Sequence, residues 1–131
     1  MFLQKLKEDE RKAFLELAHY VANASGVMNE AEHEMIDTYD REMGIDLTLE
    51  DLEDKSLETI VTAFKSDYSK KATFIEAVAI ALADGVYDSE ERVVIDRLRQ
   101  VYGFSVEYYE QVKSWLQEFN RIYRVGMELT K

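Results

Sequence analysis

The chain has 131 residues, 47% of them hydrophobic, with neither proline nor cysteine. This size predicts one domain with a single core, and the lack of cysteine excludes disulfides, thiolate metal ligands and a cysteine nucleophile. The formal net charge of −11 argues against a nucleic-acid partner, because such binding depends on lysine and arginine, and favours a basic protein or divalent cations.

The compartment is also indicated by composition. No stretch approaches the roughly 20 apolar residues that span a bilayer. The first residues, MFLQKLKEDERK, lack the apolar core and cleavage site of a secretory signal. We therefore expect a cytoplasmic protein without direct membrane insertion. Because proline is absent and only five residues are glycine, long helices are expected.

The first half of the chain predicts a series of helices. A short leading turn around Leu3 precedes a helix over about 9–24, where apolar residues recur every three or four positions. Gly26 is expected to close that helix, and Asn29 to cap the next one, over about 30–43, which ends at Gly44. The connector, residues 46–68, predicts two short helices that begin after Thr48 and Ser56.

The second half predicts three further helices. Ser69 is expected to cap a helix over about 70–83, whose sequence AVAIALA indicates the most buried element. A helix over about 89–102 follows, with Val94 and Val101 among its inward residues. The last helix runs from Ser105 to about Met127; we expect it to cross the domain, brace both halves and project its last turns past the core. Its apolar stripe is Val106, Tyr109, Val112, Leu116, Phe119 and Tyr123, widened by Trp115 and Ile122.

The chain contains an internal repeat. Residues 15–45 reappear as residues 74–104 with a constant offset of 59, and nine of the 31 aligned positions are identical, mostly alanines, turn glycines and acids. The sequence therefore predicts an all-α domain of six to seven helices, built on two helix-loop-helix units at about 13–45 and 72–104. A helical connector and a long C-terminal helix complete it. We expect the two units to pack face to face, so that their bends are neighbours.

The bends hold the candidate metal ligands. The second bend, ADGVYDSEE, contributes Asp84, Asp88 and Glu91, and the first, ASGVMNEAE, contributes Glu32 and Asn29. Carboxylate and amide oxygens suit Ca²⁺ or Mg²⁺ better than Zn²⁺. The spacing is not that of an EF-hand, which requires an oxygen ligand at the third position and glycine at the sixth. Helix capping by the same residues is the alternative, and the sequence leaves both open.

Nothing in the sequence indicates an active site. His19 and His33 have no nucleophile arranged beside them, and motifs of hydrolases, metalloproteases and nucleotide-binding proteins are absent. We therefore expect no enzyme, no catalytic residue and no cofactor other than a cation.

The pattern of the second bend, a helix ending in Ala-Asp-Gly followed by a capped helix with glutamate, resembles the TerB-like family. This family comprises tellurite-resistance and stress-response proteins and the amino-terminal domain of DjlA-type membrane co-chaperones. The resemblance covers about residues 10–125. It implies a bacterial all-helical domain that binds a divalent cation through acidic bend residues and works in stress-response complexes. Asp84 and Glu91 match the family pattern, whereas Ser25 replaces the aspartate in the first bend.

An adaptor without a metal site, acting as a co-chaperone or scaffold, is the alternative function. Its docking face would be the acidic first half or the C-terminal helix, where Arg121, Arg124, Met127 and Leu129 are available. A protein partner is expected in either case. The sequence leaves the partner, the cation and the oligomeric state open.

Overall fold

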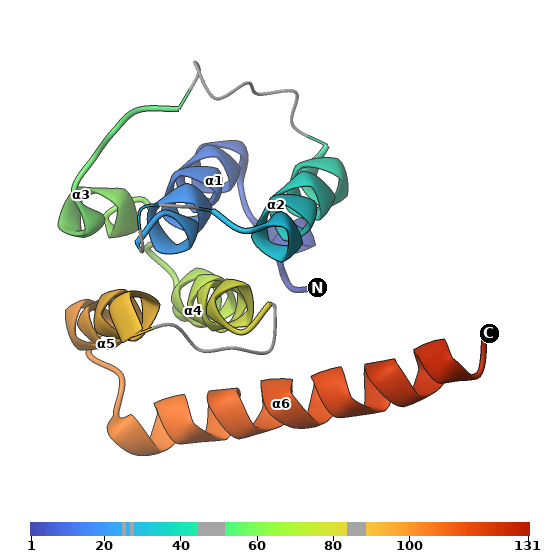
Figure 1. Ribbon diagram of the computed structural model, residues 1–131. Helices are drawn as coiled ribbons and strands as arrows, with labels where there is room; N and C mark the ends of the chain where they lie inside the picture. The colour runs from blue at the N-terminus through green and yellow to red at the C-terminus, as the bar shows by residue number, and fades with distance from the viewer. Residues whose placement is uncertain (25, 27, 45–51, 84–88) are drawn as a thin grey trace.

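The computed structural model describes residues 1–24, 26, 28–44, 52–83 and 89–131 (Figure 1). Across these ranges the chain is all-α and forms no strand, which confirms the predicted fold class. None of the helices in the described ranges is long and apolar enough to cross a bilayer. The elements in chain order are the 3-10 turn η1 (Leu3–Lys5), α1 (Glu8–Ala22), α2 (Glu30–Met43), α3 (Leu57–Val61), α4 (Asp67–Ala81), α5 (Ser89–Tyr102) and α6 (Val106–Glu128).

The helix bounds reproduce the internal repeat. The ranges of α1 and α2 become those of α4 and α5 when 59 is added to each residue number. Gly44 and Gly103, which follow α2 and α5, both adopt a positive φ, 66° and 77°. Glycine takes this conformation without steric cost, and it ends the helix in both copies. The repeat is therefore a duplicated helical hairpin.

The first helices of the two hairpins form the centre of the domain. α1 packs against α4, α2 and α5 flank this pair, and α3 fills the space beside α1 and α5. The predicted burial of α4 is confirmed, because its apolar residues Phe74, Ala77, Val78, Ile80 and Ala81 are at most 1% exposed. Whether the two bends are neighbours depends on residues 25, 27 and 84–88, which lie outside the described ranges.

Two buried carboxylates attach the flanking chain to the hairpins. Glu76 of α4 accepts hydrogen bonds from the amino group of Met1 (2.8 Å) and the backbone N–H of Phe2 (3.1 Å). Glu16 of α1 accepts from the backbone N–H of Glu53 (2.8 Å) and pairs with the Lys55 ammonium at 3.3 Å. Buried carboxylates need such partners, and these partners place the leading turn and the connector.

Several details differ from the sequence predictions. The cap of α4 is Ser66, and Ser69 is its reciprocal partner three residues later. Asn23, rather than Gly26, is the C-terminal cap of α1. Val101 is 40% exposed rather than inward. The short helix predicted after Thr48 falls mostly outside the described residues, whereas α3 begins after Ser56 as expected.

The long last helix is only half covered. α6 lies along one side of the body, packs mainly on α4, and runs past the other helices to the C-terminus (Figure 1). Its first turns join an aromatic cluster around Phe74, whose ring contacts those of Tyr108 and Tyr109 at 6.0 and 6.4 Å. The main contact of α6 is with α4, which belongs to the second hairpin, and the bracing of both hairpins stays a prediction.

Candidate functional site

The first bend ends in a complete capping box. The Asn29 side chain accepts from the N–H of Glu32 at 2.9 Å, and Glu32 Oε1 accepts from the N–H of Asn29 at 3.1 Å. Both groups satisfy backbone donors that the start of α2 leaves without helical partners. The Glu32 carboxylate is only 2% exposed. The structural role predicted for these two residues is thus visible in the geometry.

The second bend is described in part. Glu91, the counterpart of Glu32, is also buried, at 4% exposure. Asp84 and Asp88 lie outside the described residues, so the ligand set predicted for this bend cannot be assembled from the described part. Within the described ranges, no three histidine or acidic side chains come close enough together to hold a metal ion.

The fit of a divalent cation rests on a single oxygen. Glu32 Oε2 is buried and accepts no hydrogen bond from the described residues. A buried carboxylate oxygen without a donor is costly, and a cation would relieve that cost. Since Glu32 Oε1 and the Asn29 amide oxygen already serve the capping box, the described half of the site offers one oxygen to a cation.

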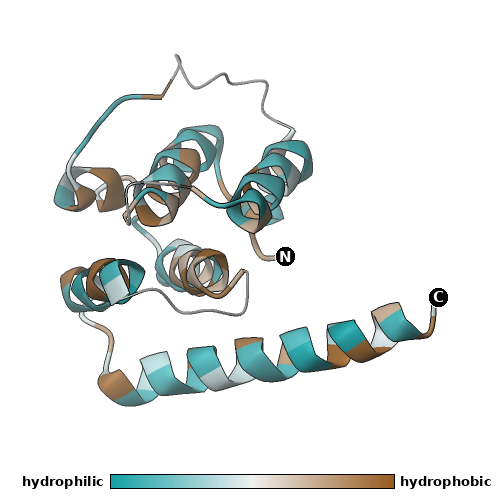
Figure 2. Cartoon of the chain, viewed as in Figure 1, coloured by the Kyte–Doolittle hydropathy of each residue, from teal (hydrophilic) through white to brown (hydrophobic). Residues whose placement is uncertain are grey.

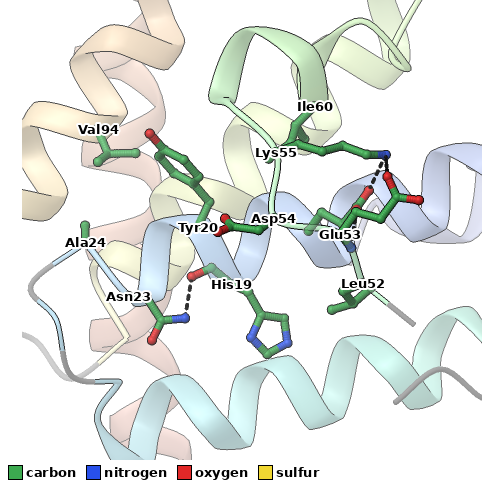
Figure 3. Close-up of a pocket in the computed structure, with 11 residues that line it drawn as sticks. His19, Tyr20, Asn23, Ala24, Leu52, Glu53, Asp54, Lys55, Ile60 and Val94 are labelled. Atoms are coloured by element: carbon green, nitrogen blue, oxygen red, sulfur yellow. Dashed lines mark hydrogen bonds and ion pairs between the residues drawn. The ribbon is translucent and has the colours of Figure 1, made fainter. Parts of the chain in front are cut away.

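A cavity of about 500 Å³ opens between α1, the connector and α5 (Figure 3). Its polar groups include Glu16, His19, Asp54 and Lys55, and its apolar lining includes Leu52, Ile60 and Val94. Lys55 points to the Glu16 and Glu53 carboxylates, and hydrogen bonding to Glu16 raises the pKa of the ammonium. The connector is held to α1 at the edge of this cavity.

His19 contributes an imidazole to the cavity lining. Burial lowers its pKa, the nearby His33 lowers it further, and Asp40 opposes the shift. The imidazole is therefore neutral near pH 7 and can act as a hydrogen-bond partner or a base. Among the described residues that line the cavity there is no serine, threonine or cysteine. His33 is exposed on α2.

Most of the exposed large apolar side chains of the described residues lie on α6 and Leu129, which follows it. Figure 2 shows apolar residues recurring along α6 as far as its last turns. Six large apolar side chains beyond Leu116 have exposures of 39% to 83%, namely Phe119, Ile122, Tyr123, Val125, Met127 and Leu129. The sequence predicted that the last turns leave the core, but it placed Phe119 and Tyr123 on the core side.

The exposed rings form a row that starts on the body. Phe2 contacts Trp115 at 6.0 Å, Trp115 contacts Phe119 at 5.7 Å, and Phe119 stacks on Tyr123 at 6.4 Å with an interplanar angle of 14°. Neighbouring rings hold one another in place through such contacts. The row therefore presents a preformed apolar surface.

Comparisons of this chain with known protein families, curated proteins and solved structures find no match.

Proposed function

We propose that this domain is a non-enzymatic adaptor that binds another protein through the second half of α6. Its docking surface, which we call the terminal stripe, consists of Phe119, Ile122, Tyr123 and Leu129. A TerB-like role in a cytoplasmic bacterial stress-response complex, including tellurite resistance, agrees with this proposal, since the resemblance implies work in complexes. The observation that carries the proposal is the exposure of the terminal stripe.

The terminal stripe continues a face that the core covers earlier in the helix. Val112 and Leu116 are 5% and 2% exposed, whereas Phe119 and Tyr123 are 39% and 61% exposed. Spacings of three and four residues keep all four side chains on one side of an α-helix. The face that packs on the body in the first half thus has no cover from described residues in the second half.

Water is an unfavourable environment for this segment. Residues 119–130 form about three helical turns, and a helix of that length without packing is marginal in water. Contiguous exposed apolar surface on a globular protein is typical of a protein interaction site. The stability of the segment therefore depends on a partner that buries the terminal stripe.

The charges on α6 indicate the chemistry of the partner. Three i,i+3 pairs occupy most of its charged side chains, namely Lys113 with Glu110, Arg121 with Glu118 and Lys131 with Glu128. Because these charges neutralise each other locally, the stripe does not select for strong charge of either sign. An amphipathic helix with an apolar face fits it best.

A partner-capture experiment tests this proposal. The wild-type chain, Tyr123→Glu and the control Gln117→Glu serve as baits in lysate of the source cell, with quantification by mass spectrometry. Gln117 lies on the same helix, is exposed and points away from the stripe, so the control adds the same charge elsewhere. We expect Tyr123→Glu alone to lose the captured partners. Identical profiles for the three baits would refute docking through the stripe.

A weak divalent-cation site at the bends is the second candidate function. Its specific support is the buried Glu32 Oε2, and it would draw on Asp84, Asp88 and Glu91 from the second bend, with Asn29 beside Glu32. Ca²⁺ or Mg²⁺ is the expected ion.

Calorimetric titration with Ca²⁺, Mg²⁺ and Zn²⁺ decides this candidate. We expect heat with wild-type protein and with Glu34→Gln, a neighbour whose side chain is exposed, and loss of that heat with Glu32→Gln and Asp84→Ala. The absence of heat and of any change in melting temperature at millimolar cation would remove the cation site.

A further inference from the structure

We propose that the helix bound by the terminal stripe is α6 of a second copy of this chain, paired in antiparallel orientation to form a symmetric dimer. This inference rests on the proposed function and names the partner of the same surface. Three independent features of the chain support it: the distribution of charge, the side of α6 on which the stripe lies, and a glycine within the stripe.

Charge limits where two copies can meet. Residues 106–131 hold four acidic and four basic side chains, so the formal charge of −11 resides entirely in residues 1–105. Two bodies of this charge repel each other, and the repulsion weakens with separation. α5 and the segment 106–131 both carry no formal net charge, and of these two the second also carries the exposed apolar stripe, so two copies can touch there without bringing net negative charge together.

The orientation follows from the side on which the stripe lies. Phe119 and Tyr123 of the terminal stripe share a helix face with Val112 and Leu116, which are buried against the body of their own copy. In a parallel pair, the first half of the second α6 would occupy the space of the first body. In an antiparallel pair, the second halves overlap over about 18 Å, at 1.5 Å per residue for residues 119–130. The two bodies then lie at opposite ends, which also separates their charges.

Gly126 fits a close helix contact. It lies three residues after Tyr123, on the side of the stripe, and a Cβ built on it meets no atom within 4 Å. Glycine inside a helix is less favourable than alanine, so a compensating role is expected. Without a side chain, this position lets a second backbone or ring approach closely.

The contact is self-complementary, as a two-fold axis requires. Each copy contributes the same aromatic and aliphatic residues and the same glycine, and the i,i+3 ion pairs leave the stripe uncharged. Because the paired segments are only about three turns long, we expect a micromolar dissociation constant rather than the nanomolar one typical of large obligate interfaces.

Sedimentation equilibrium of the full chain over a wide concentration range tests the dimer. We expect wild type and Gln117→Glu to shift from monomer to dimer, and Tyr123→Glu to weaken the association at least tenfold. Circular dichroism confirms that each variant is folded. A wild type that stays monomeric up to millimolar concentration overturns the inference, as does a dimer that Tyr123→Glu leaves unchanged.

A crosslinking experiment tests the geometry. Because the chain has no cysteine, a single introduced thiol reports only on its own position. Ile122→Cys, on the terminal stripe, should give a crosslinked dimer with a short bismaleimide, whereas Ser114→Cys, on the opposite face, should not. Equal crosslinking at both positions contradicts the proposed pairing.

Failure of the dimer can be told apart from failure of the adaptor function. A monomeric wild type combined with loss of captured partners in Tyr123→Glu means that the stripe binds a different chain, which refutes only the second copy. A monomeric wild type with unchanged capture refutes both.

Discussion

The two hairpins have the same helix pattern, but they contact different flanking segments of the chain. At equivalent positions, α1 carries Leu15 and Glu16 where α4 carries Phe74 and Ile75, and Leu17 stands opposite Glu76. Phe74 contacts the rings at the start of α6, whereas Leu15 is buried without any such helix. Both copies of the duplicated hairpin thus have the same helices, and a few residue differences between them determine which flanking segment packs on each one.

The largest difference is expected at the aromatic position. Phe74→Ala removes the central ring of the cluster that docks α6 and should lower the free energy of unfolding by about 3 to 5 kcal/mol. Leu15→Ala, its repeat counterpart, should cost about 2 to 5 kcal/mol without loosening α6. Denaturant titration measures both changes, and hydrogen exchange in Val106–Leu116 separates them. Equal exchange in α6 for the two variants would contradict the assignment of α6 to the second hairpin.

The buried carboxylates of Glu76 and Glu16 offer a second test of the difference between the two hairpins. Glu76→Ala leaves the N–H of Phe2 without its acceptor, and Glu16→Ala does the same to the N–H of Glu53. Each should cost about 1 to 3 kcal/mol. Limited proteolysis should cut near the N-terminus in the first variant and in the connector in the second. The same cleavage pattern in both would show that these contacts do not place the two segments.

The caps of α2 and α5 test whether the bends are still equivalent. Asn29→Ala removes the observed capping contact and should cost about 1 kcal/mol. Asp88→Ala should cost the same if Asp88 only caps α5. Thermal unfolding with and without Ca²⁺ distinguishes the roles: a cation-dependent loss for Asp88→Ala alone would indicate a ligand, and equal losses in both media would indicate caps.

The smallest effect on stability is expected at His19, whose counterpart in α4 is the apolar Val78. Burial lowers the pKa of His19 from 6.5 in the folded state. As pH falls through 6.5, the unfolded chain therefore binds a proton before the folded chain does, and stability decreases with falling pH. We expect His19→Gln to reduce this slope between about pH 5 and 7 in urea titrations. An unchanged slope would show that His19 contributes nothing to the pH dependence.

The repeat, the hydrophobic periodicity and the positions of glycine and serine predict much of the fold. The offset of 59 predicted both hairpins, and Gly44 predicted the end of α2, because a positive φ restricts the residue type. The prediction that Ser69 caps α4 was wrong. Ser66 and Ser69 both fit the pattern of a cap, and only the backbone conformation shows that the helix begins after Ser66. The burial of Phe119 and Tyr123 was also mispredicted, since a helical stripe does not reveal where its support ends.

Less of the candidate site than of the fold could be predicted from the sequence. Asn29 and Glu32 were recognised as a capping pair, because their spacing of three residues is local. Glu32 Oε2 accepts no hydrogen bond from the described residues, and this depends on which side chains surround it in the fold, which no local pattern encodes. The connections of Glu16 to the connector and of Glu76 to the N-terminus join residues 37 to 75 positions apart. The only sign of these contacts in the sequence is that each of the two glutamates lies among apolar residues.

The contrast between the covered and the uncovered half of α6 is the basis of the proposed function. Hydrogen exchange measured at low and high protein concentration tests most directly whether two copies pair through the uncovered half. The account predicts slow exchange in Val106–Leu116 at both concentrations, and protection of residues 119–129 only at high concentration in wild type, with none in Tyr123→Glu. Equal protection of residues 119–129 at every concentration and in both proteins would contradict it.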